Sequence, residues 1–446
     1  MKLVIIGGDA AGMSAASRTK RLDPTAEVTV IEQTRDVSYS ACGMPYNVAD
    51  PTRHMDDLIV RPAEVFQQKM GIRVMTEYRA QTIDPGKRLV TAMGPDGKPI
   101  DVPYDNLLLA TGARPIIPDL PGFDLPGVLA LKSLSQGRAI KEYLNTHAVA
   151  QVAIIGMGYI GLEMCEAFSS LGLSVVMIKP GPDLLPWMPR EMAATVAQEL
   201  DAHQIRIDAG NTVQGIESVD DGLKIFGTAG EHTADLVLVA VGVQPNSELA
   251  AGAGLALGPS SAIAVDHGLR TSHDAIFAAG DCADAFHVVT GKKTWVPLAL
   301  RANRAGWAVA DQVCGNNIEL PGIAGTAVFK VFDLEVARTG LQLGASQKAG
   351  FEPAEVTITT RSRAHAHPGA TSIQVQMVAD KKSGRLLGAQ MVGKEGVAHR
   401  INAAAVALHA RMTVNQFLQC DLSYAPPFGP VWDPLLTAAN QLIKKL

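Results

Sequence analysis

Two glycine-rich loops, each between an apolar strand and a helix, constrain the fold of this chain more than any other feature. The first runs Gly7-Gly-Asp-Ala-Ala-Gly12, after a buried strand at 3–6 and before a helix at 13–21. A second strand at 27–31 ends at Glu32, about twenty residues beyond the loop, where an acid meets the adenosine ribose of a bound dinucleotide. The spacing predicts a Rossmann-type unit in which Gly7, Gly8, Ala11 and Gly12 approach a pyrophosphate. Asp9 replaces the usual middle glycine, so its side chain must point away.

The second loop, Gly156-Met-Gly-Tyr-Ile-Gly161, repeats the device between a strand at 152–155 and a helix at 162–171. Gly156, Gly158 and Gly161 take the glycine positions, and a further strand at 174–178 is followed by Lys179. An NADH-preferring site commonly has an acid there, so Lys179 either favours NADPH by meeting its 2′-phosphate or is only a solvated lysine. Two such folds imply two nucleotides facing each other, as hydride transfer requires. The alternative is that one copy is a structural relic.

Further buried strands carry small residues at their ends, where backbone can lie against a ligand. Leu107–Gly112 ends in Thr111 and Gly112, and Ala275–Ala283 contains Gly280 and Asp281, which is well placed for a ribityl chain. The strand at 235–246 is where the chain returns from an inserted nucleotide unit. Beyond residue 325 the pattern changes to strands at 327–332, 356–360, 372–378 and 386–392 and a helix at 401–409, an α+β unit without glycine loops.

Composition excludes several classes. The 446 residues are 47% hydrophobic and carry a net charge of -5, which is typical of a soluble globular protein and gives no basic excess for nucleic acid. No apolar run approaches the roughly 18 residues of a membrane helix. The five cysteines lack CxxC spacing, so neither a disulfide framework nor a metal site is expected, which fits a reducing cytoplasm.

Cys42, in Val37-Ser-Tyr-Ser-Ala-Cys-Gly-Met-Pro-Tyr46, is a lone thiol close after the first dinucleotide unit. A reactive thiol needs a lowered pKa. Pro45 suits a first helical position, which would place Cys42 ahead of the positive end of a helix. The alternative is a small buried core cysteine.

These segments resemble, over the whole chain, the flavoprotein pyridine nucleotide-disulfide oxidoreductases, and among them the single-cysteine branch of coenzyme A-disulfide reductases, NADH oxidases and peroxidases. The motifs are the two loops, Ala110-Thr-Gly112, Gly280-Asp-Cys282, Pro297-Leu-Ala299 and Ser-Ala-Cys42-Gly in place of CxxxxC. The ending Tyr424-Ala-Pro-Pro-Phe-Gly-Pro-Val-Trp-Asp433 is similar to that of coenzyme A-disulfide and polysulfide reductases.

The resemblance implies an α/β fold with an FAD-binding Rossmann-like domain at 1–117 and 241–322, an NAD(P)H-binding one at 118–240 and an α+β dimerisation domain at 323–446. It implies a homodimer in which Tyr424 reaches the partner's cysteine. His367 stands where many relatives have a tyrosine, so it is either a proton donor or structural. The cofactor positions it implies include Pro297 and Ala299, and the positions it implies for a coenzyme A-like substrate are Ser14, Arg18, Arg21, Ser38, Arg61, Lys69, Asn303 and Trp432.

The expected function is therefore reduction of a small disulfide or persulfide, with coenzyme A disulfide first, by NADPH or NADH through FAD and Cys42. One alternative is an oxidase or peroxidase in which Cys42 cycles through sulfenic acid. Another is a flavin-bound redox sensor with little turnover.

Overall fold

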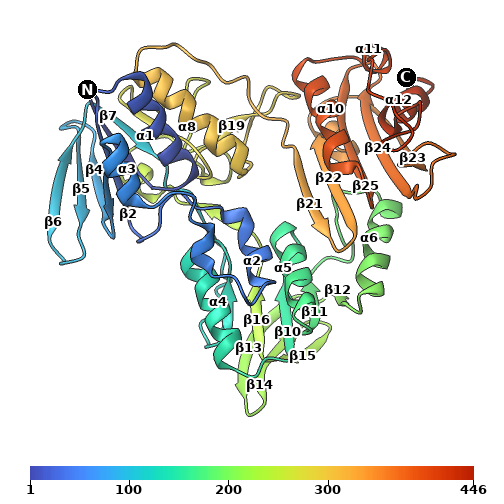
Figure 1. The fold of residues 1–446 in the computed structure, drawn as a ribbon, viewed down its shortest axis with the longest axis horizontal. Helices are drawn as coiled ribbons and strands as arrows, with labels where there is room; N and C mark the ends of the chain where they lie inside the picture. Colours follow the sequence, from blue (N-terminus) through green and yellow to red (C-terminus); the bar gives the residue numbers. More distant parts are fainter.

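The first unit of the computed structural model, which describes residues 1–446, is built on a parallel sheet of order β18-β7-β1-β2-β3. β1 lies in the centre with four of its five residues buried, which is why its sequence is apolar without alternation. Helices α1 and α8 pack against each other beside the sheet, although they lie far apart in the sequence (Figure 1). The elements are β1 (Lys2–Ile6), α1 (Ala10–Leu22), β2 (Glu27–Glu32), α2 (Met44–Val48), α3 (Ala63–Met70), β3 (Arg73–Thr76), β7 (Asn106–Leu109), β18 (Ile276–Ala278) and α8 (Ala299–Val313).

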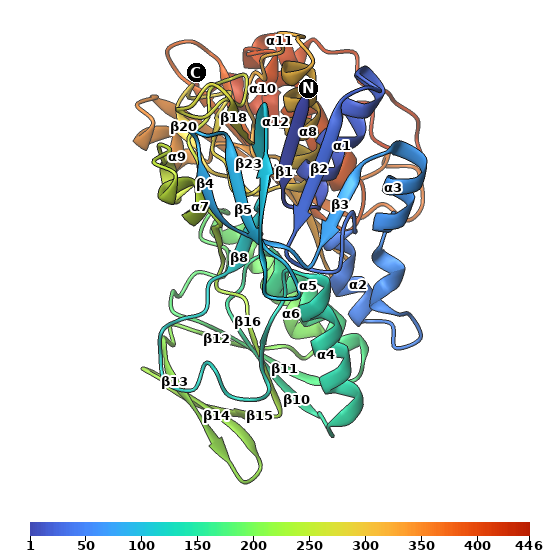
Figure 2. The same ribbon diagram turned by 90° about the vertical axis from the view of Figure 1, so that its left-hand side faces the viewer.

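The second unit repeats this plan with a parallel sheet of order β12-β11-β10-β16-β9. It forms the lower part of the molecule, where the teal and green segments lie (Figure 2). Its elements are β9 (Val128–Ala130), α4 (Leu134–Thr146), β10 (Gln151–Ile155), α5 (Tyr159–Ser170), β11 (Ser174–Lys179), α6 (Arg190–Ala202), β12 (Arg206–Ala209) and β16 (Leu236–Val239).

A short antiparallel pair joins the two units where the chain crosses between them. β8 (Ala113–Pro115) leads out of the first unit and pairs with β17 (Val243–Pro245), which leads back. Each unit also has a three-stranded antiparallel sheet: β4 (Arg79–Asp84), β5 (Leu89–Met93) and β6 (Pro99–Pro103) in the first, and β13 (Val213–Val219), β14 (Gly222–Gly227) and β15 (Gly230–Ala234) in the second.

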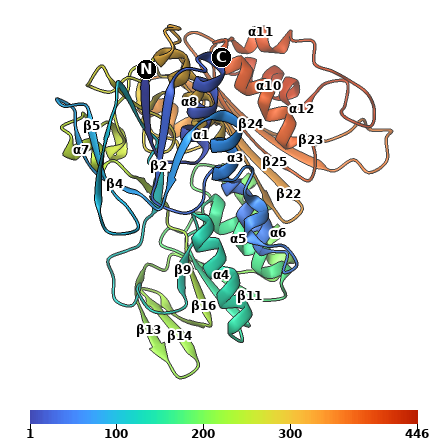
Figure 3. The same ribbon diagram turned by 60° about the vertical axis from the view of Figure 1, so that its left-hand side comes forward.

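The C-terminal unit is an antiparallel sheet of order β21-β22-β25-β24-β23 with helices on it, drawn in orange and red (Figure 3). Every residue of β25 is buried, because both faces of that strand are covered. All four strands and the helix expected here are present, and the fold class is confirmed. β22 and α12 were not expected. The elements are β21 (Ala327–Val331), β22 (Leu334–Gly340), α9 (Leu343–Lys348), β23 (Pro353–Arg361), β24 (Ser372–Asp380), β25 (Leu386–Gly393), α10 (Val397–His409), α11 (Val414–Leu418) and α12 (Pro434–Ile443).

No helix of the structure combines the length and the apolar character needed to cross a lipid bilayer.

Candidate active site

The first glycine loop, Gly7–Gly12, connects β1 to α1 and has no room for side chains at its two end positions. Gly7 has φ of +109°, and a Cβ there would lie 2.1 Å from the carbonyl oxygen of Ala110. A Cβ on Gly12 would lie 1.9 Å from the Gly7 oxygen. Ala11 is equally confined, because a Cβ on Gly306 of α8 would lie 2.2 Å from its carbonyl oxygen. The loop is therefore compressed against β7 and α8.

Glu32, at the end of β2, is held against this loop. One carboxylate oxygen accepts the N–H of Gly8 at 2.8 Å, and the other accepts the N–H and the hydroxyl of Thr34, both at 2.8 Å. A carboxylate has about four acceptor positions, so one remains for a ribose hydroxyl. These residues fit the adenosine end of FAD.

Asp9 occupies the N-cap position of α1, but its side chain makes no capping hydrogen bond. Its carboxylate instead accepts the N–H of Tyr39 at 3.4 Å. Burial, more than any charge, raises the pKa of Asp9 to about 6. The bond fastens the glycine loop to residues 38–43, which we call the cysteine loop.

The cysteine loop is fixed to the first glycine loop at a second point, since the N–H of Ser38 donates to the oxygen of Gly8 at 2.9 Å. Ser38 has φ of +50°, an uncommon conformation for a residue other than glycine. Cys42 follows in a single turn, Ala41–Gly43, directly before α2, and Pro45 is the second residue of that helix, one position beyond the predicted first. Cys42 is exposed, so it is not a core cysteine.

The predicted lowering of the Cys42 pKa is wrong in this structure. Crowding of the thiol by protein raises its pKa, and Glu163 on α5 raises it further, followed by Asp281 and Asp9. Lys132 is the cation that opposes them. Because α2 has only five residues, the positive end of its dipole lowers the pKa of Cys42 less than the three carboxylates raise it.

Asp281 follows β18 and lies in the same region as the thiol. Its carboxylate accepts Lys132 Nζ at 2.9 Å, and its backbone oxygen accepts Trp295 Nε1 at 2.8 Å. Gly280 approaches Ala11 closely, since an added Cβ would come within 3.1 Å of the Ala11 side chain. Pro297 and Ala299 lie where the chain enters α8. Lys132 was not predicted from the sequence.

Thr111 and Gly112 lie where the chain leaves the first unit. The Thr111 hydroxyl donates to the backbone oxygen of Asn246 at 2.5 Å, and the Asn246 side chain donates back to Thr111 at 2.8 Å. A Cβ on Gly112, which has φ of +69°, would meet nothing within 4 Å. Thr111 therefore helps to hold together the two segments that connect the first and second units, and Gly112 borders open space.

The second glycine loop, Gly156–Gly161, repeats the compressed geometry. A Cβ on Gly156 would lie 2.4 Å from the Ala240 oxygen, and one on Gly161 would lie 2.6 Å from the Gly156 oxygen. At Gly158, by contrast, a Cβ would meet nothing within 4 Å. The middle glycine thus borders open space.

Lys179, at the end of β11, folds back on its own loop. Its Nζ donates to the backbone oxygen of Asp183 and, at 3.5 Å, to that of Leu184. Burial lowers its pKa. Its ammonium is therefore partly satisfied by carbonyl groups of its own loop.

Most of the residues expected to meet a coenzyme A-like substrate lie on or beside α1, α3 and α8, whereas Ser38 lies in the cysteine loop and Trp432 lies near the C-terminus. Ser14 donates to Asn303 at 2.6 Å across the α1–α8 contact. Arg18 is not free as expected: it forms a two-bond ion pair with Asp311, at 2.8 and 3.0 Å, over the ring of Trp307. Arg21, Arg61 and Lys69 are without ion pairs in the structure; Arg21 and Lys69 lie in the last turns of α1 and α3, and Arg61 lies over the Phe66 ring.

The C-terminal candidates lie on two segments that touch each other. We call residues 362–371 the histidine loop and Tyr424–Asp433 the tail. Ala364 N–H donates to the Pro426 oxygen at 3.2 Å. Arg400 bonds Asp433 at 2.7 Å and the backbone oxygens of Phe428 and Ser362 at 2.8 and 3.0 Å.

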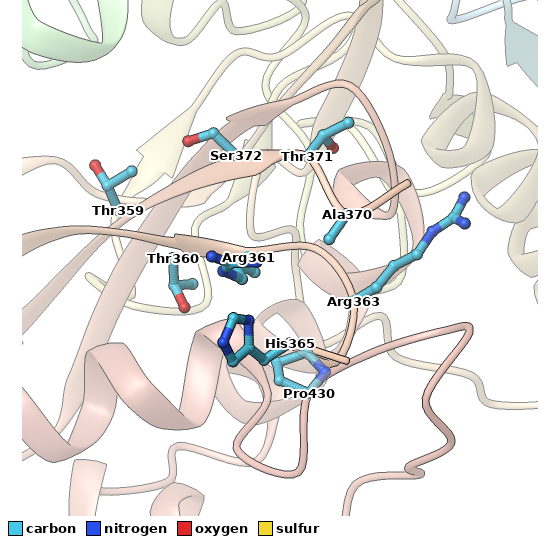
Figure 4. Close-up of a pocket in the computed structure, with 9 residues that line it drawn as sticks. All are labelled: Thr359, Thr360, Arg361, Arg363, His365, Ala370, Thr371, Ser372 and Pro430. Carbon is cyan, nitrogen blue, oxygen red and sulfur yellow. The ribbon is translucent and has the colours of Figure 1, made fainter. Parts of the chain in front are cut away.

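The two segments border an open polar hollow of about 640 Å³ (Figure 4). His367 lies outside its lining and bonds the oxygen of Pro368 through Nδ1 at 3.0 Å. The rings of Tyr424 and Trp432 are 49% and 59% exposed and make no hydrogen bond within the chain. Within one chain, the side chains of Tyr424 and Trp432 therefore have no hydrogen-bond partner. The lining residues are Thr359, Thr360, Arg361, Arg363, His365, Ala370, Thr371, Ser372 and Pro430.

Tyr46 and Glu163 were also missed by the sequence reasoning. The Tyr46 hydroxyl, one turn beyond Cys42, donates to Glu163 at 3.0 Å. Their spacing offered a signal, since Tyr46 follows Cys42 by four residues and Glu163 follows Gly161 by two.

Comparison with known proteins agrees with this geometry. The chain is 40% identical, over 99% of its length and 98% of the relative, to the NAD(P)H sulfur oxidoreductase (CoA-dependent) of Pyrococcus abyssi. It is 31% identical, over 100% and 99%, to the NADH oxidase of Methanocaldococcus jannaschii. The solved NAD-dependent persulfide reductase from A. fulgidus superposes with a TM-score of 0.96 at 38% identity, covering 100% of this chain and 83% of that one.

Residues 1–306 match the family described as pyridine nucleotide-disulphide oxidoreductase, and residues 326–434 match its dimerisation domain. The chain therefore belongs to the pyridine nucleotide-disulphide oxidoreductases and is an enzyme that uses FAD and NAD(P)H.

Proposed function

We propose that this enzyme is a homodimer that reduces a coenzyme A disulfide or persulfide with NAD(P)H, through Cys42. The observation that carries the proposal is the attachment of the cysteine loop to the first glycine loop at Ser38 and Tyr39, which holds one exposed thiol beside the expected flavin site. The similarity to a CoA-dependent sulfur oxidoreductase over nearly the whole of both chains supports the substrate class.

Bound FAD would supply the two-electron chemistry, accepting hydride from NAD(P)H and reducing a disulfide made to Cys42. The first glycine loop, Glu32, Thr111, Gly112 and Asp281 would hold it, with Gly280, Pro297 and Ala299 beside it. The thiolate of Cys42 attacks one sulfur of the substrate, the other sulfur leaves as a thiolate, and a mixed disulfide remains. Its reduction returns Cys42 and the second thiol, so NAD(P)H and one proton convert coenzyme A disulfide to two thiols, or a coenzyme A persulfide to one thiol and hydrogen sulfide.

The substrate phosphates would meet the cations that have no ion pair within the chain. Arg21, Arg61 and Lys69 fulfil this condition, whereas Arg18 is engaged by Asp311 and is left a supporting role. Ser14, Ser38 and Asn303 supply polar contacts near them.

The partner subunit would supply Tyr424 and His367 to protonate the leaving thiolate, and Trp432 to cover the substrate. Their exposure, together with the dimerisation domain, supports this. Mixing inactive Cys42→Ser and Tyr424→Phe subunits tests the exchange: a heterodimer then has one site with both defects and one with neither. Activity should return to about half the wild-type rate per heterodimer. Verified subunit exchange without recovery would show that each chain completes its own site.

The test of the reaction itself is Cys42→Ser. The variant should keep its yellow FAD, because the side chain at 42 lies outside both glycine loops, and lose NAD(P)H-dependent reduction of coenzyme A disulfide and persulfide. Cys420→Ser, at a partly buried thiol far along the chain, is the matched control and should retain activity. Full activity in Cys42→Ser would refute the mechanism.

Oxygen or peroxide reduction is the second candidate, because the chain is also 31% identical to an NADH oxidase. Steady-state NAD(P)H consumption with oxygen, hydrogen peroxide and coenzyme A disulfide as alternative acceptors distinguishes the two. The proposal requires the disulfide or persulfide to give the highest kcat/KM.

A further inference from the structure

The chain before Cys42 and the chain after it are attached to different units. Before the thiol, the cysteine loop is tied to the first glycine loop through Ser38 and Tyr39. After it, residues 44–58 form α2, which packs on α4 and α5 (Figure 1), and a further helical turn. The buried apolar side chains of residues 44–58 lie in one core cluster with side chains of α4 and α5, and none of them lies in the core cluster of the first unit. These side chains, each at most 7% exposed, are Met44, Val48, Met55 and Leu58.

Lys141 of α4 adds polar contacts to this packing. Its Nζ donates to the backbone oxygens of Asn47, Asp50 and Arg53 at 2.9, 2.8 and 2.6 Å, and the side-chain oxygen of Asn47 lies at 3.3 Å. These carbonyls lie at and beyond the C-terminal end of α2, where a lysine can bond the last carbonyls of a helix. An ammonium group has three hydrogens, so the three backbone bonds satisfy it completely. Lys141 therefore joins α2 and the loop after it to the second unit.

Arg138, one turn before Lys141 on α4, bonds the chain on both sides of Cys42. Its two Nη atoms donate to the carboxylate of Asp36 at 2.7 and 2.8 Å, and its Nε donates to Asp56 at 2.7 Å. Asp36 is buried, and a two-bond contact between a guanidinium and a carboxylate is both strong and directional. The guanidinium therefore fixes both ends of the cysteine-bearing stretch relative to α4.

We propose that residues 44–58, which belong to the first unit by sequence, are held by the second unit, and that Lys141 and Arg138 are positioning residues that fix Cys42 beside the expected flavin site. The thiol lies between an attachment to the first glycine loop and an attachment to α4, so its place depends on how the two units are arranged. A displacement of the second unit, which is expected to bind NAD(P)H, is thereby transmitted to the thiol. The inference rests on the proposed role of Cys42 as the reacting thiol.

The attachment is tested by hydrogen–deuterium exchange of the FAD-bound enzyme, read by peptide mass spectrometry. Lys141→Met keeps the aliphatic stem and removes the ammonium. Peptides within residues 44–58 should exchange at least about tenfold faster, since a hydrogen bond to a charged group is worth that factor or more, and peptides containing residues 7–12 should be unchanged. Lys20→Met is the control, because Nζ of Lys20 also donates to two backbone oxygens, those of Pro24 and Ala26, but within the first unit. If exchange at residues 44–58 does not respond to Lys141→Met, or responds equally to Lys20→Met, the proposal is overturned.

A milder pair of variants covers the case in which Lys141→Met does not fold. Ile140→Val removes one methyl group from a fully buried side chain of α4, and Ile5→Val does the same in β1. Each should raise exchange in its own unit about threefold or more, as the loss of a buried methyl group weakens packing. Residues 44–58 should respond to Ile140→Val and not to Ile5→Val, and any other pattern would overturn the proposal.

The positioning role is tested by separating electron transfer to the flavin from electron transfer to the substrate. Ferricyanide accepts electrons from reduced flavin without a thiol, so NAD(P)H-dependent ferricyanide reduction does not require Cys42 to be in place. Lys141→Met should lower kcat for coenzyme A disulfide about tenfold or more, because a small misplacement of a reacting group is costly even when the substitution is remote. FAD content and ferricyanide reduction should be unchanged.

Unchanged disulfide reduction in Lys141→Met, or a parallel loss of disulfide and ferricyanide reduction, would overturn the positioning role. Failure of the proposed function would appear separately, as full disulfide reduction in Cys42→Ser with the exchange results unaffected.

Discussion

Replacing Asp9 with asparagine removes a negative charge from the first glycine loop while keeping the shape of the side chain. Asparagine and aspartate are equally good at the first position before a helix, and Asp9 makes no capping bond that would be lost. The amide oxygen of asparagine can still accept the N–H of Tyr39. The variant therefore isolates the electrostatic cost of the carboxylate.

The size of that cost follows from the pKa of Asp9. Burial raises the pKa from 3.8 to about 6, with smaller contributions from Glu32 and Asp281, against the Tyr39 bond and Lys132. Because the folded state binds this proton more tightly than the unfolded chain, ionisation destabilises the fold above about pH 6 and has no effect below about pH 4. A shift of about two units corresponds to about 3 kcal/mol. Asp9→Asn should thus gain up to about 3 kcal/mol at pH 8, and the gain should shrink towards zero as the pH falls from 6 to 4.

The assay is urea unfolding of the apoprotein at pH 8 and pH 4.5. Tryptophan fluorescence is followed in a background in which Trp187 and Trp432 are replaced by phenylalanine, so that it reports the first unit: Trp295 bonds the backbone of Asp281 and Trp307 lies on α8. Midpoints of that transition are compared between proteins, because a chain of several units does not unfold in a single step. Asp119→Asn, at an exposed carboxylate, is the control and should not change them. An equal gain at both pH values, or none at pH 8, would refute the reasoning.

Three other predictions follow from the site geometry. Gly7→Ala should prevent recovery of FAD-containing protein, since its Cβ would lie 2.1 Å from Ala110 O, whereas Gly158→Ala, with open space at its Cβ, should keep FAD by visible absorbance and raise the KM for NAD(P)H. Lys179→Glu should move the ratio of kcat/KM for NADPH over NADH towards NADH; if Lys179 only braces the carbonyls of Asp183 and Leu184, the ratio will stay constant. Arg400→Met should lower the free energy of unfolding by about 3 kcal/mol, because it leaves the partly buried Asp433 unpaired. The melting temperature and the rate of disulfide reduction should both fall; unchanged activity would show that the tail has no part in the site.

The regular parts of the fold could be predicted because their signals are local. Both glycine loops lie between the strand and helix that their sequences predict, since close packing of backbone against backbone requires glycine wherever it occurs. β22 was missed because its hairpin with β21 turns at Phe332 and Asp333, and Phe332, with φ of +50°, is not a residue type that usually marks such a turn. α12 did carry its signals, with Asp433 capping it and Pro434 in its first turn.

The charged side chains of the site could not be predicted in the same way. The partner of Arg18 is Asp311, 293 residues further along the chain, and only the packing of α1 on α8 brings them together. Lys179 shows the converse, because its Nζ returns to carbonyls four and five residues away. The pKa of Cys42 depends on carboxylates from three other segments of the chain, and the residues next to Cys42 in the sequence do not reveal the combined effect of those carboxylates.

Asp9 shows why this loop can depart from the glycine pattern. A middle glycine leaves the backbone free to approach a pyrophosphate, and an aspartate there gives up some of that freedom. In exchange its carboxylate holds the N–H of Tyr39, while Gly8 holds that of Ser38. Two adjacent loop residues therefore attach the cysteine loop to the first glycine loop.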